Sequence, residues 1–429
     1  MKNLLFILLT TLSLVFFSCE KLVDDTPPSL SISSPSNNQQ VNGGDTLFIS
    51  GVATDENNVS TISISLRDNN DIPVLPTVTL QPNEKEHSFN TPYFFNDLHM
   101  PSGQYYFSIQ ASDGNNSTSK YIYIQYGEIP KTRTGVFFFD SFGGSSSAYQ
   151  LNNSNATLYK TVSGDLLAGA ANSFMQHLIF IGEYTAKITA IDLAANQNAW
   201  TIANANSSVP YYTNTYFYDK ELFVCTRDGE IKAYKNNGSP SFYATVQSSH
   251  YSENVLYHDN IFFSEEKAVG NNNRYISAYW TNSGTIFNRL GLNEDVVGLY
   301  AFTPNKAVML ANDYSTNDGK IYVYDAPSNT KTTLFNISSG AIDAFEEIST
   351  GIYLIAQNGN LVLVNANNYS TLPYLSGINA NKIKYDAFSN ELYVIDNNII
   401  TAYDFSSKNV LFSYTHTSTV VDLVFLFNK

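Results

Sequence analysis

One short phrase recurs along this chain and constrains its fold more than any other feature. The stretch ELFVCTRDGEIKAYK at 221–235 is spelled again as ELYVIDNNIITAYD at 391–404. In each copy two apolar runs flank a polar turn, which is Asp228-Gly229 in the first copy and Asn397-Asn398 in the second. β-Branched and aromatic residues on either side of such a turn predict a β-hairpin, because Gly, Asn and Asp tolerate a positive φ angle.

The second half of this phrase occurs seven times, once about every 40–45 residues. Strand-like segments such as SFYATV and VLFSYTH follow the copies. Four strands in a unit of this length are typical of a β-propeller blade, so we predict a seven-bladed β-propeller over residues 135–429. The copies centre on Tyr149, Ile191, Tyr234, Tyr279, Tyr324, Val364 and Tyr403.

The two ends of the repeat array predict how the ring closes. The first copy begins at GVFFFDS (135–141), which matches the second strand of a blade, and its inner strand is missing. The last copy is complete, and VVDLVFLF (420–427) remains after it. We predict that this C-terminal strand completes the first blade, because closure hides two sheet edges that would otherwise pair with other chains.

A second module precedes the propeller. Residues 28–127 contain alternating strands separated by turn residues, which predicts an antiparallel β-sandwich. Residues 20–27 form a polar tether before it and residues 128–134 a hinge after it. Carboxylates at Asp55, Glu56 and Asp113 could bind calcium, although solvated turn acids are the simpler explanation. The module resembles bacterial Ig-like domains through Pro27-Pro28, Ser34-Pro35, Gly43, Ile49, Gly51, Ala53 and Asp55.

The N-terminus has the features of an export signal. Lys2 precedes an apolar stretch over 4–17, which is too short to span a membrane, and Ser18-Cys19 follows. Residues 1–19 resemble a bacterial lipoprotein signal, although Phe16 stands where Leu is usual. This resemblance implies a lipid on Cys19, with the acyl chains as the only membrane contact. It also implies attachment to the outer membrane of a Gram-negative, Bacteroidetes-like bacterium, on either its periplasmic or its external side. The alternative is an ordinary signal peptide with an incidental Cys19.

A lipidated Cys19 leaves Cys225 without a disulfide partner. Cys225 lies in the apolar run of a predicted strand, so we expect a small buried hydrophobic side chain and not a nucleophile.

Motifs that would indicate catalysis are absent. The chain lacks GxSxG, HExxH, CxxC and the Walker phosphate loop, and its six histidines are dispersed. Ser145-Ser146-Ser147 after Gly143-Gly144 indicates a flexible turn and not a nucleophile elbow. A net charge of −15 argues against nucleic-acid partners. We therefore predict no catalytic residues and no bound cofactor, with calcium as the exception.

The propeller repeats resemble PQQ-type, quinoprotein-like repeats in three phrases, LFVCTRDGEIKAYKNNG, KIYVYD and LIAQNGNLVLVNA. This resemblance implies the fold. It does not imply the redox activity of some such proteins, because no cofactor-binding constellation is recognisable in this chain.

Acidic residues follow the first strand of most predicted hairpins, and these turns should emerge on one face of the ring. They indicate a binding face for a cation or a cationic partner, or simply the preference of β-turns for Asp. Within this set, Asn312, Asp313 and Asp318 form the best candidate calcium site, since they offer hard oxygens on one loop. The candidate face comprises Asp140, Glu183, Arg227, Asp228, Glu265, Glu266, Arg274, Asp313 and Asp396, with His250, Glu294, Asp295 and His416 on neighbouring loops.

These observations predict an envelope-anchored binding or scaffolding lipoprotein. The propeller would be the interaction platform and the Ig-like module a spacer, with another envelope protein or an extracellular ligand as the partner. The alternative is a propeller enzyme that acts on glycans or uses a quinone cofactor. That alternative requires carboxylates or metal ligands that converge on one face of the ring.

The anchor can be tested directly. Cys19→Ala should move the protein from the membrane fraction to the soluble fraction and abolish incorporation of labelled fatty acid, because the acyl chains supply the membrane affinity. Cys225→Ala is the control and should remain lipidated. Equal membrane association of the wild type and Cys19→Ala would show that Cys19 is not the anchor.

Overall fold

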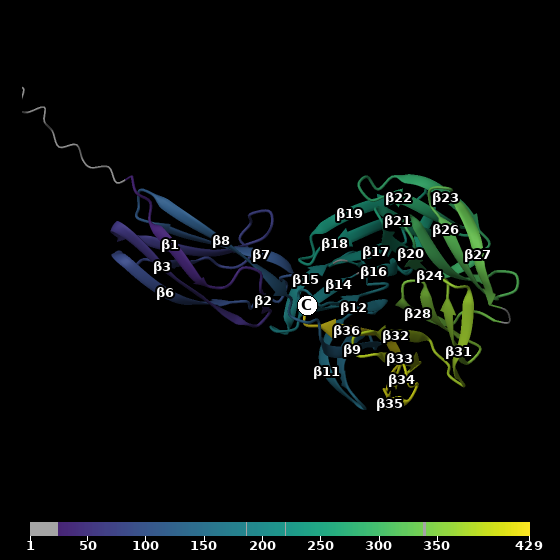
Figure 1. The fold of residues 1–429 in the computed structure, drawn as a ribbon. Helices are drawn as coiled ribbons and strands as arrows, with labels where there is room; N and C mark the ends of the chain where they lie inside the picture. The colour runs from purple at the N-terminus through teal and green to yellow at the C-terminus, as the bar shows by residue number, and fades with distance from the viewer. Residues whose placement is uncertain (1–24, 186, 219, 338–339) are drawn as a thin grey trace, which may run out of the picture. The chain divides into compact units, whose positions relative to one another are not determined.

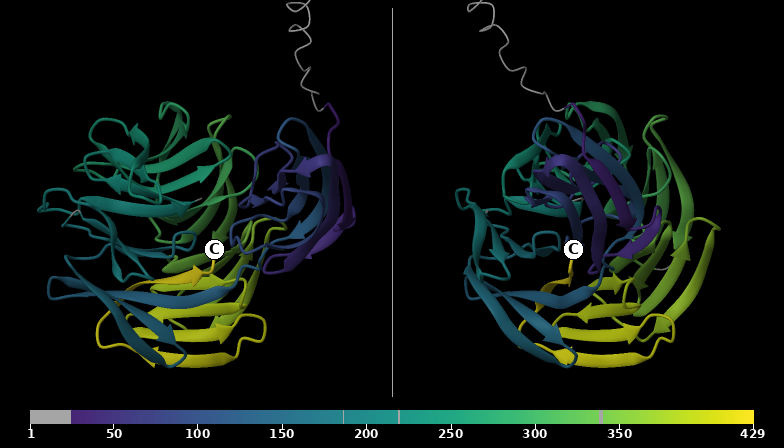
Figure 2. Two further views of the ribbon diagram at one scale, coloured as in Figure 1. Left: turned by 90° about the vertical axis from the view of Figure 1, so that its left-hand side faces the viewer. Right: turned by 60° about the vertical axis from the view of Figure 1, so that its left-hand side comes forward.

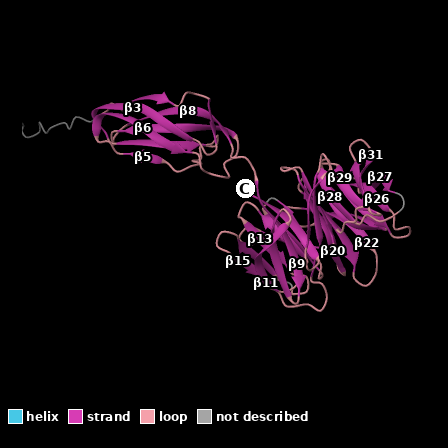
Figure 3. Ribbon diagram, turned by 90° about the horizontal axis from the view of Figure 1, so that it is seen from below, coloured by secondary structure: helices cyan, strands magenta, loops and turns pink. Residues whose placement is uncertain are grey.

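The computed structural model describes residues 25–185, 187–218, 220–337 and 340–429. Every regular element in these ranges is a β-strand (Figure 3). The predicted signal peptide with Cys19 and most of the predicted tether lie outside them. In the described residues no helix is long and apolar enough to cross a membrane. The chain divides into two compact units, Met1–Pro130 and Lys131–Lys429.

The first unit contains two sheets, with strand orders β1-β3-β6 and β2-β8-β7-β4-β5. Alternation of apolar and polar residues sets the faces of these strands. In β7, for example, Tyr105, Phe107 and Ile109 are buried while their neighbours face outward. The strands are β1 (Ser29–Ser34), β2 (Gln39–Asn42), β3 (Thr46–Val59), β4 (Thr61–Arg67), β5 (Val78–Leu80), β6 (Glu84–Phe94), β7 (Gly103–Ser112) and β8 (Ser117–Gly127).

Side chains from both sheets meet in one core. Ile49 and Phe107 are fully buried there, and the Tyr93 ring meets the Phe107 ring edge-on at a centroid distance of 5.0 Å. Edge-on packing is the arrangement that the charge distribution of aromatic rings favours. The first unit is therefore a β-sandwich, as predicted.

The second unit contains seven four-stranded antiparallel sheets around a central axis (Figure 1). These sheets are the seven predicted blades. From the inner to the outer strand, blade 1 is β36 (Val420–Phe427), β9 (Arg133–Phe142), β10 (Ser145–Asn152) and β11 (Asn155–Ser163); blade 2 is β12 (Ala168–Asn172), β13 (His177–Ile181), β14 (Ile188–Asp192) and β15 (Gln197–Ile202); blade 3 is β16 (Tyr212–Tyr218), β17 (Glu221–Thr226), β18 (Glu230–Tyr234) and β19 (Pro240–Thr245); blade 4 is β20 (His250–His258), β21 (Ile261–Ala268), β22 (Arg274–Trp280) and β23 (Ile286–Leu292).

The remaining blades follow the same order. Blade 5 is β24 (Glu294–Ala301), β25 (Lys306–Asp313), β26 (Gly319–Asp325) and β27 (Thr330–Ile337); blade 6 is β28 (Ala344–Ser349), β29 (Ile352–Gln357), β30 (Asn360–Asn365) and β31 (Ser370–Ser376); blade 7 is β32 (Lys382–Asp386), β33 (Glu391–Asp396), β34 (Ile399–Asp404) and β35 (Val410–Thr415).

The second strand of each blade is buried on both faces because blades pack against each other. All of HLIFI in β13 is buried, and so are five of the six residues of ELFVCT in β17. This explains why these strands are continuous apolar runs without alternation. Cys225 lies in β17 and is fully buried, and it is a free thiol within the part of the chain that the structure describes. Burial raises the pKa of this thiol to about 12.

The recurring phrase marks a β-bulge. The pairing of the third strand with the fourth shifts register directly after Ala148, Ala190, Ala233, Ala278 and Ala402. Each of these alanines is fully buried. A bulge bends the strand and increases its twist, so the repeated Ala-aromatic or Ala-Ile pair gives these blades a common twisted shape.

The C-terminal strand closes the ring. β36 runs beside β9, where the yellow C-terminal strand lies next to a blue one (Figure 2), and the two pair antiparallel. Leu423 lies opposite Phe138 and Val424 opposite Phe137. Leu423 and Phe138 are fully buried in a cluster with Tyr393 and Ile400 of blade 7. This confirms the predicted closure, since residues from the two ends of the propeller sequence form one blade.

One local expectation was wrong. Ser145, Ser146 and Ser147 belong to β10, where they pair with Phe142, Ser141 and Asp140 of β9. The turn is confined to Gly143 and Gly144, whose φ angles of 61° and 79° suit glycine. Three consecutive serines after two glycines have the composition of a turn, but ladder hydrogen bonds on both sides hold them in the strand.

Closure can be tested by truncation and by a single substitution. Deleting residues 419–429 should cause aggregation or a much lower melting temperature, because β9 becomes an open edge. Leu423→Ala should destabilise the unit by about 2–5 kcal/mol through the cavity that it leaves. Val410→Ala is the control, since Val410 is 59% exposed, and should change stability by about 0.5 kcal/mol or less. Equal melting of Leu423→Ala and Val410→Ala would contradict closure by β36.

Candidate functional site

The turns between second and third strands share one end of the blades with the starts of the inner strands. In blade 5, Glu294 at the start of β24 pairs with Asp313 at the end of β25, and in blade 1, Val420 pairs with Asp140. We call this end of the propeller unit the upper face. The candidate residues lie at or near it, but their side chains do not form one continuous acidic ring.

Arg274 organises the acids of blades 4 and 5. This side chain is 5% exposed, and its guanidinium contacts Glu265 at 2.5 Å, Asp295 at 2.7 Å and Glu253. Burial acts to lower the pKa of Arg274, but the carboxylates, Glu265 first, outweigh burial and hold the pKa above its ordinary value. The carboxylate oxygens of the three acids lie within 4.8 Å of one another, as the ligands of a metal ion would. The Arg274 guanidinium already occupies the position of the cation.

Glu265 and Glu266 were expected in a turn and lie instead in β21. Successive strand residues face opposite sides, so Glu266 points away from Arg274. It accepts a hydrogen bond from the Tyr279 hydroxyl and lies 3.2 Å from Arg289. Both glutamates are fully buried, and neither is a free acid on the upper face.

The three residues of the candidate calcium site each have partners within the protein. Asp313 accepts hydrogen bonds from the backbone of Ser315 and Thr316 and forms an ion pair with Lys320. These contacts, Lys320 first, lower its pKa. Asn312 bonds the backbone of Ile342, and Asp318 accepts from the Gly340 N–H. Calcium binding by these three residues stays a prediction.

In blades 2 and 3 the acids Glu183 and Asp228 lie in the turns after the second strands, and in blade 7 Asp396 is the last residue of β33. Burial raises the pKa of Glu183, whose neighbour Asp165 adds to the effect. Asp228 accepts a hydrogen bond from Thr226, and Asp396 accepts one from Asn397 at 2.9 Å. Arg227 stacks over the Tyr251 ring at 4.0 Å. The preference of turns for Asp and these local hydrogen bonds explain why Asp228 and Asp396 occur there, so no ligand is needed to explain them.

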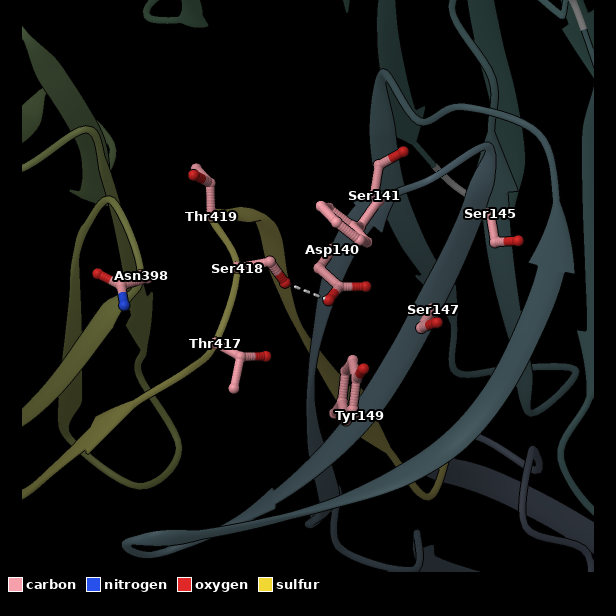
Figure 4. A pocket seen from close by; sticks show the side chains of 10 residues that line it. Asp140, Ser141, Ser145, Ser147, Tyr149, Asn398, Thr417, Ser418 and Thr419 are labelled. Carbon is pink, nitrogen blue, oxygen red and sulfur yellow. Dashed lines mark hydrogen bonds between the residues drawn. The ribbon is translucent and has the colours of Figure 1, made fainter.

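Asp140 differs because it lines a pocket between blade 1 and blade 7 (Figure 4). Its Oδ2 atom accepts hydrogen bonds from His416 at 2.9 Å and from Ser418 at 2.5 Å. Asp140 is 5% exposed and His416 is 6% exposed. The bonds join β9 to the loop between β35 and β36, so closure of the ring builds this wall of the pocket.

The pocket has a volume of about 660 Å³, and its lining is uncharged and polar apart from Asp140 and the apolar Phe142. Hydroxyl groups can both donate and accept hydrogen bonds. Phe142 lies at the pocket and is 81% exposed, which is the highest value among the large hydrophobic side chains of the described residues. The remaining lining residues are Ser141, Ser145, Ser147, Tyr149, Asn398, Thr417, Ser418 and Thr419.

The Ser418, His416 and Asp140 side chains do not form a nucleophile relay. A serine nucleophile needs a hydrogen bond to a base that a carboxylate orients. Here Ser418 and His416 both bond the same oxygen of Asp140, and the other His416 nitrogen faces Tyr414 at 3.2 Å. This arrangement links β9 of blade 1 to the loop that follows blade 7.

The central channel contains charged groups that the sequence analysis missed. Lys382 of β32 forms an ion pair with Asp422 of β36 at 2.9 Å and donates to the Val421 carbonyl at 3.0 Å. Lys384 and Glu346 line the same cavity of about 360 Å³, and the charge of Glu346 raises the pKa of Lys384. Asp343 also lines this cavity, so three carboxylates and two lysines meet there. The Lys382–Asp422 ion pair joins the inner strands of blades 7 and 1.

The acids of the first unit also have local partners. Asp113 accepts hydrogen bonds from the backbone of Asn115 and Asn116, and Asp55 accepts one from Asn57. Asp113 has the contacts of a turn acid, whereas Asp55 lies in β3 and its Oδ2 atom is buried without a hydrogen-bond partner among the described residues. Calcium binding at Asp55, Glu56 and Asp113 stays a prediction. The sequence carries no clear signal for the pocket at Asp140, because its hydroxyl residues come from two segments at opposite ends of the propeller sequence.

Comparison with known proteins supports the assignment of the first module. Residues 28–120 match the bacterial Ig domain family, as the sequence pattern predicted. No curated protein matches the chain.

Solved structures with a similar fold include several propellers. A quinoprotein alcohol dehydrogenase-like protein from Bacteroides thetaiotaomicron is 13% identical, with 94% of this chain and 99% of that chain covered and a TM-score of 0.49. Apo AztD from Citrobacter koseri is 9% identical, with 68% and 98% covered and a TM-score of 0.46. The Pan2 WD40 domain of Neurospora crassa is 12% identical, with 59% and 79% covered and a TM-score of 0.46. At these identities the similarity concerns the fold alone.

The Arg274 network makes a prediction about stability. Arg274→Leu should destabilise the propeller by about 3–5 kcal/mol, because it leaves the buried Glu265 carboxylate without its cation. Adding Glu265→Leu should recover a large part of this loss. Asp396→Asn is the control and should change the free energy of unfolding by about 0.5 kcal/mol or less. Denaturant unfolding measures all three, and a harmless Arg274→Leu would show that the acids do not depend on the arginine.

Proposed function

We propose that this protein is a lipid-anchored binding protein of the bacterial outer membrane, in which the propeller holds a protein partner and the Ig-like module acts as a spacer. The observation that carries the proposal is the pocket at Asp140. It combines an exposed phenylalanine with a ring of hydroxyl groups and a single carboxylate.

The composition of this site favours a protein ligand. Protein interfaces typically combine a few aromatic anchors with a polar surround. Phe142 is such an anchor, and the hydroxyls of Ser145, Ser147 and Thr417 provide hydrogen bonds around it. Asp140 makes a partner with a basic or amide side chain the best match, in line with the net charge of −15.

The lipid anchor and the outer-membrane location rest on the sequence around Cys19. The PQQ-type assignment of the repeats also stays a prediction. A glycan-degrading or quinone-dependent enzyme remains the alternative, and the geometry around Asp140 offers it no specific support, because Ser418 and His416 share one carboxylate oxygen.

A photo-crosslinking amino acid placed at position 142 tests the proposal in cells. It should capture one defined envelope protein. Ser147→Arg in the same chain should reduce that adduct about tenfold or more, because a long cation fills the pocket and repels a basic partner; tenfold corresponds to about 1.4 kcal/mol. The melting temperature of Ser147→Arg should stay near that of the wild type.

The matched control places the crosslinker at position 372 on β31, where Leu372 is also exposed, at 60%. Capture of the same proteins from positions 142 and 372 would contradict a specific site at the pocket. So would an adduct at position 142 that Ser147→Arg leaves unchanged.

A further inference from the structure

Three tyrosines stand together on the outer face of the five-stranded sheet in the first unit. Tyr106 of β7 lies opposite Tyr123 of β8 in the antiparallel register, and Tyr121 lies two residues before Tyr123 on the same face. The Tyr106 ring is 5.6 Å from the Tyr123 ring and 5.9 Å from the Tyr121 ring. Tyr121 is 60% exposed and Tyr123 is 40% exposed.

The core of the sandwich does not need these rings. Tyr105, Phe107, Ile122 and Ile124 point inward from the same two strands and supply the buried face. Leaving large aromatic side chains in water forgoes the stabilisation that burial would give. An exposed cluster of three, in register on two strands, is therefore a candidate contact surface.

The residues around the tyrosines carry almost no charge, although the chain as a whole has a net charge of −15. Arg67 is the single charged side chain on this face of the three central strands, and it forms an ion pair with Asp71 at 2.9 Å. The Tyr106 hydroxyl donates to the same carboxylate. Ser65 also points to this side but is buried. The other accessible outward positions of β4, β7 and β8 are Thr61, Ser63, Gln104, Ser108, Gln110, Ser112, Ser117, Ser119 and Gln125.

We infer that this face, which we call the tyrosine face, binds a soluble, neutral polysaccharide. The apolar ring faces of Tyr106, Tyr121 and Tyr123 match the C–H faces of sugar rings. The surrounding hydroxyls and amides both donate and accept hydrogen bonds, as sugar hydroxyl groups require.

Charge and shape narrow the ligand class further. A face without unpaired charge gains nothing from an anionic or cationic polymer, whose ionic groups would lose hydration without compensation. The Tyr106 ring is tilted by 70° to Tyr121 and by 46° to Tyr123. The surface is therefore ridged, which suits a twisted soluble chain and not the flat face of a crystalline polymer.

A protein partner fits this face less well. The core of a protein interface usually contains aliphatic or methionine side chains together with aromatic anchors in pockets. The outward strand positions named above hold serine, threonine, glutamine and the three tyrosines, without an aliphatic side chain.

Native affinity electrophoresis of the full chain tests the inference. Gels would contain hydroxyethyl cellulose, galactomannan, arabinoxylan or dextran as neutral polymers, and alginate as the charged one. We expect at least one neutral polymer to retard the wild type and alginate to leave it unaffected. Tyr121→Ala with Tyr123→Ala should weaken the binding by about tenfold or more, since each aromatic contact contributes about 0.5–1.5 kcal/mol.

The matched control is Phe48→Ala with Phe94→Ala on the opposite sheet, where the two rings are 50% and 57% exposed. This variant should bind as the wild type does, and Tyr121→Phe with Tyr123→Phe should keep most of the affinity because the ring faces remain. The crosslink from position 142 should persist in the tyrosine variants, which separates this inference from the partner proposed at Asp140.

Four results would overturn the inference: no retardation by any neutral polymer, retardation that the alanine pair leaves unchanged, equal loss in the Phe48 and Phe94 control, or preference for alginate. A crosslinker at position 121 that captures a protein while no neutral polymer binds would assign the face to a protein partner instead.

Discussion

The rest of the propeller depends on the pairing of β36 with β9. A ring of sheets leaves two open edges unless its ends meet, and open edges recruit other chains. Here the final strand of the chain supplies the innermost strand of the first blade, with Leu423 and Phe138 buried between blades 1 and 7. The loop that leads into this strand carries His416 and Ser418, whose bonds to Asp140 form one wall of the pocket. The same closure therefore makes the fold and the candidate site.

Several charged groups in the propeller hold neighbouring blades together. Arg274 gathers acids from blades 4 and 5, and Lys382 joins blade 7 to Asp422 of the closing strand. Buried pairs of this kind contribute little net stability, but loss of one partner is costly. The two surfaces for which we propose ligands, the hydroxyl-lined pocket and the tyrosine face, carry few charged side chains. Binding by such surfaces depends on contacts with aromatic ring faces and on hydrogen bonds with hydroxyl and amide groups, which both donate and accept.

The sequence predicted the architecture because the architecture is periodic. The Ala-Tyr repeat from Tyr149 to Tyr403 gave the blades, and the unmatched segment VVDLVFLF gave the closure. The site was harder to predict, because the side chains at Asp140 come from the first and last blades. The Arg274 network depends on which strands of neighbouring blades meet. Tyr121 and Tyr123 alternate with Ile122 and Ile124, and since all four can be buried, the pattern does not reveal which pair faces water.

Hydrogen exchange of backbone amides in β36 and β9 tests the central claim most directly, that one strand pairing both closes the ring and builds the pocket. If it does, the hydrogen bonds of these amides break only when the whole propeller unfolds, so these amides should be among the slowest to exchange. The Asp140→Ala variant should keep that protection in β36 while it speeds exchange in the loop at 416–419. Exchange of β36 at the rate of a fraying terminus, with the other blades still protected, would contradict the account.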